Sequence, residues 1–261
     1  MTHCPGCEHT EGFRFLGEKG VVRLLRCPSC GFVFADRAVW REPYSEKDYY
    51  DPEFQPNERY PLQPSATESD RMNTILRHTK PGRFLDFGGG LGKTGLAALA
   101  RGFDVTLIED SERAVVNGGK HHPEIRWIRG RAIPAGTPDM TFDVAGMFHV
   151  LEHLPDPREV LSQLHRVLKP GGLLIVEVPN WGSHLRRLQG VHWQYVIDHH
   201  VNYFDRGSLT RLAGTKGFQF KAAEYRRTFA NNEQHPWKES VKKVLCIFGF
   251  GEILRCVFTR N

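Results

Sequence analysis

The chain has 261 residues, of which 40% are hydrophobic and 25% are charged, and it carries a formal net charge of +5. These values fit one medium-sized globular domain with a small addition and exclude a disordered or fibrous protein; the charge is spread without a long basic block, so it permits nucleic-acid binding without indicating it. No apolar run approaches the roughly 20 residues of a membrane-spanning helix, and no apolar segment follows the N-terminal M-T-H-C-P, so we expect a cytoplasmic protein without a membrane partner.

Two C-x-x-C pairs stand near the N-terminus, Cys4 with Cys7 and Cys27 with Cys30, with 19 residues between them. Each pair places two thiolates on one tight turn, and two such turns complete a tetrahedral zinc site. Residues 1–36 are therefore predicted to form a zinc ribbon whose structural metal supplies the folding energy that so small a unit lacks. Four aromatic side chains are expected to form its core rather than to stack nucleic-acid bases. They are Phe13, Phe15, Phe32 and Phe34.

Residues 37–80 are predicted to link the ribbon to the main domain. A helix is expected over residues 65–78, because Ser65 suits the N-cap and Glu68, three residues on, completes a capping box. Tyr49 and Tyr50 are candidates to reach a bound cofactor or substrate, with packing between the ribbon and the main domain as an equal alternative.

The stretch Arg83–Gly92 reads R-F-L-D-F-G-G-G-L-G, an apolar strand that runs into a glycine cluster, and a helix-like segment over residues 93–101 follows. A strand, a glycine turn and a helix open a nucleotide-binding α/β domain. A phosphate loop would need glycine at position 87, where Phe87 stands, and a dinucleotide turn is matched only by the weak pattern G-x-G-x-x-G at residues 90–95. Asp86 favours a third interpretation, because a carboxylate repels pyrophosphate and attracts a cationic ligand.

Further strands follow in the order expected of an α/β sheet. Residues 104–109 end in Glu109, 21 residues after Gly88, and this spacing suits a carboxylate that reaches a ribose diol. Asp110 is adjacent, and Ser111 suits the N-cap of a helix over residues 112–120. The remaining strands are expected at residues 125–130, 142–147, 173–178, 218–228 and 252–259, and a helix over residues 158–168 is expected to stop at the turn K-P-G-G of residues 169–172.

Residues 84–92 resemble the first motif of class I S-adenosylmethionine-dependent methyltransferases. Residues 151–157, L-E-H-L-P-D-P, resemble a second step of that superfamily, and the K-P-G-G turn before a hydrophobic strand is a third. These motifs occur in the family's order between Pro81 and Phe220. The resemblance implies an α/β fold with a Rossmann-like, mostly parallel seven-stranded sheet and an antiparallel last strand over residues 81–261. It also implies cofactor-covering helices within residues 37–80.

The resemblance further implies S-adenosylmethionine as the cofactor. The residues that it assigns to cofactor binding are Asp86, Gly88, Gly90, Glu109, Asp110, Arg131, Ala132 and Phe148. Where the family often has G-D-A, this chain has Gly130-Arg131-Ala132. Because arginine cannot accept a hydrogen bond, the adenine ring is expected to be held by backbone groups and apolar contacts.

Methyl transfer is an in-line displacement in which the enzyme aligns the nucleophile and excludes water. An oxygen or nitrogen nucleophile also needs a base, and histidine is suited to that role near neutral pH. The candidate bases are His153, His199 and His200, which the resemblance places in the substrate-binding segments. A second, divalent metal is an alternative use of this region, with His149, Glu152, His153 and His200 as its ligands.

We expect the methyl acceptor to be a small molecule, a sugar-like or natural-product metabolite methylated at oxygen, nitrogen or carbon. Two alternatives stay open: an RNA methyltransferase that binds RNA through the zinc ribbon, and a non-catalytic regulatory protein that binds the cofactor. The sequence leaves the acceptor atom and the oligomeric state open.

Overall fold

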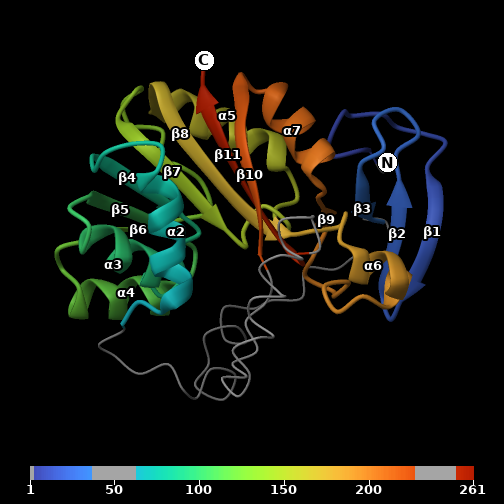
Figure 1. The fold of residues 1–261 in the computed structure, drawn as a ribbon, viewed down its shortest axis with the longest axis horizontal. Helices are drawn as coiled ribbons and strands as arrows, with labels where there is room; N and C mark the ends of the chain where they lie inside the picture. The colour runs from blue at the N-terminus through green and yellow to red at the C-terminus, as the bar shows by residue number, and fades with distance from the viewer. Residues whose placement is uncertain (1–2, 37–62, 227–250) are drawn as a thin grey trace. The chain divides into compact units, whose positions relative to one another are not determined.

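The computed structural model describes residues 3–36, 63–226 and 251–261 (Figure 1). Tyr49 and Tyr50 lie outside the described residues. The chain divides into two compact units. The first unit draws on residues 1–43, 149–159 and 176–258, and the second on residues 44–148, 160–175 and 259–261. None of the helices in the described part of the chain is long and apolar enough to cross a membrane.

A seven-stranded sheet has the order β10-β11-β8-β7-β4-β5-β6, mostly parallel with one antiparallel strand, as the sequence predicts. Its strands are β4 (Arg83–Phe87), β5 (Asp104–Glu109), β6 (Arg126–Arg129), β7 (Phe142–Phe148), β8 (Leu168–Pro179), β10 (Phe218–Arg226) and β11 (Ile253–Arg260). Runs of buried, mostly apolar residues build the central strands β4, β5, β7 and β8, as expected for strands covered on both faces, whereas β6 has no buried residue. Because β4 and β5 are parallel neighbours, with Phe87 opposite Ile108, their carboxyl ends meet at one edge of the sheet.

Helices of the second unit begin at residues that satisfy their first backbone N–H groups. In α2 (Ala66–Leu76), Ser65 and Glu68 form the predicted capping box. In α4 (Glu112–His121), the Ser111 hydroxyl accepts a hydrogen bond from the backbone N–H of Ala114 at 3.1 Å. The helix α3 (Lys93–Leu99) begins directly after the glycine turn.

The K-P-G-G segment departs from the prediction. The helix α5 (Pro157–Val167) ends before it, and β8 begins at Leu168, so the segment belongs to the strand rather than to a separate capping turn. Gly171 has a φ of +74°, and a Cβ on Gly172 would lie 2.8 Å from the carbonyl oxygen of Lys169. The two glycines therefore permit a local irregularity at the start of a long strand.

The ribbon forms part of a four-stranded sheet with the order β1-β2-β3-β9. Its strands are β1 (Arg14–Lys19), β2 (Val22–Arg26), β3 (Val33–Ala35) and β9 (Asn202–Tyr203). The last strand comes from a distant part of the chain and pairs with β3 in antiparallel register, Val33 opposite Tyr203. Other elements of this unit are α6 (His184–Gln189), the short 3-10 helix η1 (Gly190–His192) and α7 (Arg206–Gly214).

The core of this ribbon sheet is shared with distant residues. Val22, Leu24 and Val33 of the ribbon pack in one cluster with Trp181 and Trp193. Of the four aromatic residues expected in the ribbon core, Phe32 and Phe34 are buried, and Phe13 meets Phe34 edge to face at 5.2 Å. Phe15 is 49% exposed, so its assignment to the core is wrong. The ribbon obtains the missing apolar surface from residues 181–203 instead.

Candidate active site and metal centre

The four ribbon cysteines converge. Their sulfur atoms all lie within 4.8 Å of one another, with Cys4 Sγ 3.5 Å from Cys30 Sγ and Cys7 Sγ 3.6 Å from Cys27 Sγ. Sulfurs bound to one tetrahedral zinc at about 2.3 Å would be about 3.8 Å apart, so the donor set fits that ion. Burial raises the pKa of the Cys30 thiol to about 11, and a bound cation would favour the thiolate.

The glycine turn after β4 is closely packed. Gly88 and Gly90 have φ values of +69° and +55°, which side chains with a Cβ rarely adopt. A Cβ on Gly89 would lie 2.5 Å from Cγ of Leu107 and 2.9 Å from Oδ2 of Asp86. The sequence therefore requires glycine here, both to make the turn and to leave space beside the Asp86 carboxylate.

Asp86 is a buried carboxylate with an unsatisfied oxygen. Its side chain is 1% exposed, and its Oδ2 has no hydrogen-bond partner among the described residues. Burial raises the pKa of Asp86 to about 7, although the positive charge of Arg71 opposes the shift. A buried acceptor of this kind costs free energy unless a donor or a cation meets it. The ammonium and sulfonium groups of S-adenosylmethionine would satisfy that requirement.

Glu109 is oriented by backbone groups at the end of β5. Its Oε2 accepts a hydrogen bond from the N–H of Gly90 at 2.9 Å, and its Oε1 accepts one from the N–H of Ser111 at 3.0 Å. The glycine turn and the cap of α4 thus fix one carboxylate between them. Burial raises the pKa of Glu109, and these two hydrogen bonds oppose the shift. A fixed carboxylate next to a glycine turn is suited to bind ribose hydroxyl groups.

The four remaining candidates differ in exposure. Arg131 Nε donates to Asp110 Oδ2 at 2.7 Å, and the two side chains are 67% and 50% exposed. Ala132 is exposed, while Phe148, at the end of β7, is only 9% exposed. The Arg131 side chain is thus paired with Asp110, and the expected adenine contacts of this segment stay a prediction.

Sequence reasoning missed Arg71 of α2. This 9%-exposed arginine donates from Nη1 to Thr94 Oγ1 at 2.9 Å, lies 3.7 Å from Glu68 Oε1 and is placed 4.6 Å over the Phe148 ring. It joins the helix before β4 to the residues at the ends of β4 and β7. Its one sequence signal is a positive charge on the helix face that carries Met72 and Ile75, which are fully buried.

Three histidines of the first unit form a cluster. Potential ligand atoms of His153, His199 and His200 lie within 4.8 Å of one another, and the rings of His153 and His199 stack at 5.3 Å. The Nδ1 atoms lie 2.9–3.0 Å from oxygen acceptors. These are the His199 carbonyl for His153, the Asp198 carboxylate for His199 and the Tyr195 carbonyl for His200. In each neutral ring Nδ1 therefore carries the proton, and Nε2 carries the lone pair.

The surroundings of His153 and His200 lower the basicity of their rings. Burial lowers the pKa of His200 to about 3, although the Glu152 carboxylate opposes the shift. Burial also lowers the pKa of His153, again against the charge of Glu152. Glu152 itself is 1% exposed, and its Oε2 has no hydrogen-bond partner within the described ranges. Burial thus favours the neutral form of His153 and His200, and both rings lie near the buried Glu152 carboxylate.

His149 belongs to a different network. Its Nδ1 lies 3.2 Å from Glu152 Oε1 and its Nε2 lies 3.5 Å from Glu177 Oε1. Burial would lower the pKa of His149, but the two carboxylates outweigh it and raise the pKa to about 9. Glu177 is in turn paired with the buried Arg255 at 2.6 Å. The metal-ligand set that includes His149 stays a prediction, and the group whose potential ligand atoms converge contains His199 in its place.

His149 also has an unusual backbone. Its φ of +59° is in the left-handed region, directly after the last residue of β7. Its N–H donates to the Glu177 carbonyl oxygen at 2.8 Å, which helps to hold this conformation. Neither Glu177 nor Arg255 was expected from the sequence, because each lies within an apolar strand far along the chain. A charged residue inside a buried strand was the available signal.

Comparison with known proteins identifies the fold and the family. The model of the Methyltransferase domain family matches residues 64–222, more than half of the chain. The chain is 30% identical over 101 residues to a demethylmenaquinone methyltransferase of Lysinibacillus sphaericus, which covers 36% of this chain and 40% of that protein. It is 26% identical over 171 residues to the ubiquinone/menaquinone biosynthesis C-methyltransferase UbiE of Ruegeria sp., which covers 54% of this chain and 68% of that protein. The chain thus spans from two fifths to about two thirds of these relatives.

Solved structures agree with this fold. An S-adenosylmethionine-dependent methyltransferase from Mesorhizobium loti has a TM-score of 0.57 at 17% identity, covering 75% of this chain and 99% of that one. A possible histamine N-methyltransferase from Thermotoga maritima has a TM-score of 0.55 at 23% identity, covering 74% and 88%. With the family match over residues 64–222, the conclusion is that the chain belongs to the Methyltransferase domain family.

Proposed function

We propose that this protein transfers a methyl group from S-adenosylmethionine to a small-molecule acceptor, with His153 as the general base. The observation that carries the proposal is the buried Asp86 carboxylate, whose unpartnered oxygen lies beside a glycine turn that a Cβ would fill. The bound cofactor would supply a methyl group on a sulfonium, which leaves as a neutral thioether. The protein's own residues would bind and orient the cofactor and the acceptor, and one of them would remove a proton from the acceptor.

Cofactor binding is assigned to the second unit. Asp86 would meet positive charge or an N–H donor of the cofactor, and Glu109, fixed by two backbone N–H groups, would accept hydrogen bonds from ribose hydroxyls. Gly88 and Gly90 would let the backbone approach the ligand. The apolar surface of Phe148, with the backbone at Arg131 and Ala132, would contact the adenine ring. Asp110 would act indirectly by holding the Arg131 side chain.

His153 is the preferred base of the three histidines. Its Nδ1–H donates to the His199 carbonyl oxygen, so Nε2 is the atom that would take a proton from the acceptor. His200 is unsuited to this role because its pKa of about 3 makes it too weak a base. His199 would position His153 through its carbonyl oxygen. Because the pKa of His153 lies below its ordinary value, the base form would already predominate near pH 7.

A divalent metal at the same cluster is a second candidate, favoured by one observation. All three rings have their Nδ1 atoms against oxygen acceptors, the arrangement that orients metal-binding imidazoles. Metal content separates the two candidates. A content of one zinc per chain that is lost in a Cys27→Ser variant would support His153 as a general base. A second metal ion that is lost in a His199→Gln variant would support a metal site at the histidine cluster.

A small-molecule acceptor is supported by the similarity to relatives named as menaquinone and ubiquinone methyltransferases. An RNA methyltransferase and a non-catalytic cofactor-binding protein are the alternatives. Methylation of RNA together with strongly salt-dependent RNA binding would replace the small-molecule proposal with the first. Cofactor binding without turnover across a broad acceptor panel would favour the second.

The test is formation of S-adenosylhomocysteine with quinols, phenols and glycosides as acceptors. With an active acceptor, His153→Gln should lower kcat by about 100-fold or more, the range of general-base catalysis. A matched His121→Gln variant, on the surface of α4, should retain full activity. The wild-type rate should fall only at pH values below the ordinary histidine pKa, and the His153→Gln variant should lack that fall. Equal kcat values for wild type and His153→Gln would rule out this base.

A further inference from the structure

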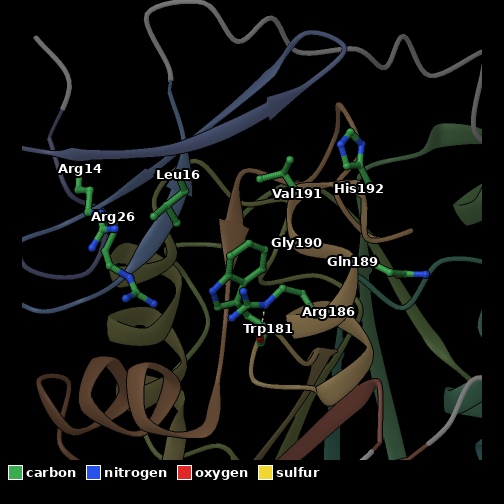
Figure 2. Close-up of a pocket in the computed structure, with 9 residues that line it drawn as sticks. All are labelled: Arg14, Leu16, Arg26, Trp181, Arg186, Gln189, Gly190, Val191 and His192. Atoms are coloured by element: carbon green, nitrogen blue, oxygen red, sulfur yellow. Dashed lines mark hydrogen bonds between the residues drawn. The ribbon is translucent and has the colours of Figure 1, made fainter.

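A cavity of about 470 Å³ opens between the ribbon strands and residues 181–192 of the first unit (Figure 2). Its lining includes Arg14 and Arg26 from β1 and β2, and Trp181 and Arg186 from the segment that contains α6. None of its nine lining residues is acidic. The cavity therefore gathers positive charge without a carboxylate of its own.

Arg14 and Arg26 are directly opposite each other in the antiparallel pair of β1 and β2. Like charges in directly opposed positions destabilise a sheet. Figure 2 shows both side chains on the same side of the cavity. Among the described residues, no carboxylate forms an ion pair with either arginine. The fold thus carries a repulsive pair that nothing in the described protein neutralises.

Arg186 adds a third positive charge. Its Nε donates to the Trp181 carbonyl oxygen at 2.7 Å, and its guanidinium lies 4.0 Å over the Trp181 ring. Burial lowers the pKa of Arg186, as do the charges of Arg26 and Arg187, while Asp205 opposes them. A guanidinium stays charged under all ordinary conditions, so this side chain is a partly desolvated cation in contact with the neutral carbonyl group and ring of Trp181.

Trp181 provides an independent indication of a ligand. Its side chain is 3% exposed, and its indole Nε1–H has no acceptor among the described residues. Figure 2 shows the indole among the lining side chains, with Arg186 against it and its nitrogen on the side of Arg26. An indole N–H can only donate, and an unsatisfied buried donor costs about 1–3 kcal/mol. A ligand oxygen at this position would remove that cost.

We propose that this cavity binds the phosphoryl group of a phosphorylated small molecule. Its oxygens would accept from the guanidinium groups of Arg14, Arg26 and Arg186 and from the Trp181 indole, and its charge would neutralise the opposed arginines. Arginine suits phosphate because its planar fork can donate two hydrogen bonds at once. The volume is in the range of small-ligand sites, with room for a nucleoside or sugar beside the phosphate. This assignment goes beyond the proposed methyl transfer and does not depend on it.

The ribbon gains a binding role under this proposal. Two of the three arginines belong to its strands, and the zinc site fixes the hairpins from which they project. The remaining polar groups of the lining, Gln189 and His192, could hydrogen bond to the part of the ligand that follows the phosphate. A nucleoside diphosphate has the phosphoryl oxygens and the polar ring substituents that such a lining would recognise.

Calorimetric titration of the zinc-loaded full chain tests the proposal with three probes: pyrophosphate, adenosine diphosphate and a 12-nucleotide single-stranded RNA. Pyrophosphate and the diphosphate should bind saturably at micromolar to submillimolar concentrations. An Arg14→Gln/Arg26→Gln variant should bind them about 100-fold more weakly, because two charge-assisted contacts are lost. Trp181→Phe keeps the ring and removes only the donor, so binding should weaken by about threefold to tenfold.

Arg23→Gln is the matched control. It removes the same charge from β2 outside the cavity, where Arg23 pairs with Glu18 at 3.8 Å, and should leave both affinities unchanged. Without ligand, Arg26→Gln should unfold at the same or a higher temperature than wild type, because repulsion is relieved. The same variant should lose the rise in Tm that the diphosphate gives to the wild type. If Arg26 had only a structural role, the Arg26→Gln variant would have a lower Tm without ligand and would keep the rise in Tm that the diphosphate causes.

Three results would overturn the proposal: no saturable binding of either phosphate probe, equal weakening by Arg23→Gln, or binding of the RNA alone. Different variants test phosphate binding and methyl transfer, so either proposal can be refuted while the other stands. His153→Gln should abolish turnover and leave phosphate binding intact, while Arg14→Gln/Arg26→Gln can lose phosphate binding whatever its effect on methyl transfer.

Discussion

The proposed cofactor residues and the histidine network are held in place in opposite ways. Asp86, Glu109 and Phe148 come from neighbouring strands of one continuous stretch, and backbone N–H groups orient Glu109. The histidine network draws on residues 149–153, 177, 195–200 and 255, and side chains and carbonyl groups hold it together. A site held by local backbone can be recognised as a sequence motif, whereas one assembled from distant segments becomes visible only in the fold.

The two regions also treat buried charge differently. Asp86 keeps one oxygen without a partner in the described part of the chain, and its pKa is raised. His149 lies between two carboxylates, and its pKa is raised because they stabilise the charged ring. The first arrangement stores an unsatisfied interaction that a ligand can meet. The second pairs its positive charge with two carboxylates, although Glu152 Oε2 has no hydrogen-bond partner among the described residues.

The largest effect is expected from the proposed zinc site, whose four cysteines all belong to the first unit. Cys27→Ser should abolish zinc binding, because three thiolates and a hydroxyl bind the ion poorly, and structural zinc contributes about 10 kcal/mol to folding in zinc-finger peptides. Amides of β2, β3 and β9 should then lose protection from hydrogen exchange, since they share one sheet and one core. Amides of β4 and β5 should stay protected.

Zinc content and hydrogen exchange measured on the same samples check this prediction. Cys256→Ser provides the control, because Cys256 is a fully buried cysteine that is not part of the sulfur cluster and should keep zinc binding intact. Equal loss of protection in β4 would show that the two regions are not independent.

The next effect concerns the unsatisfied carboxylate. Asp86→Asn keeps the shape and removes the charge, so affinity for S-adenosylmethionine should fall by about 30-fold or more, the cost of removing one partner of a buried charge pair. Arg131→Ala breaks only an exposed ion pair and should change affinity by about threefold or less. Calorimetry with each variant measures both. Equal losses of affinity in the two variants would contradict the roles proposed for Asp86 and Arg131.

The stability of the cofactor-free Asp86→Asn variant should change in the opposite direction to its affinity for the cofactor. The folded pKa of Asp86 lies near 7, above its ordinary value of 3.8, so the native state binds the proton more tightly than the unfolded state. Stability of the wild type therefore falls as pH rises through that window. At pH 8 without cofactor, the variant should unfold at the same or a higher temperature than the wild type.

The smallest effect is expected from the network around His149. His149→Asn removes the ring charge and keeps a residue that tolerates a positive φ. It should destabilise the protein by about 1 kcal/mol near pH 6, a modest figure because the His149 side chain is 37% exposed. Since its pKa rises from 6.5 to about 9, this stabilisation is complete below pH 6.5 and is lost as pH rises through 9.

Thermal unfolding of wild type and His149→Asn across pH 6–10 checks this prediction. The difference in Tm should shrink toward zero above pH 9. A difference that stays constant with pH would mean that packing or backbone strain, rather than charge, explains the role of His149.

The parts of the fold that could be predicted are those determined by interactions between residues close together in the sequence. Ser65 with Glu68 and Ser111 mark helix starts, because short polar side chains satisfy the first N–H groups of the turn that follows them. The glycine turn and the ends of β4 and β5 follow from backbone conformation and alternation. The start of β8 was missed because pairing with neighbouring strands continues through Gly171 and Gly172.

The unpredicted parts depend on partners that lie far apart in sequence. Arg71 meets Thr94 and Phe148 only when α2 packs near the ends of β4 and β7. The pairing of β9 with β3 joins residues separated by most of the chain. Such contacts have no local signal, because their stability comes from burial that the fold creates.

By itself, the sequence predicted the strands of the main sheet along the chain, the four-cysteine centre and the glycine turn with its acids, because steric limits and ligand spacing act within a few residues. Only the tertiary structure decided which histidines cluster, that His149 is paired rather than available, and that Arg14, Arg26 and Arg186 share a cavity with Trp181. These outcomes depend on distances between side chains, and the distances are set by the packing of distant segments into one core.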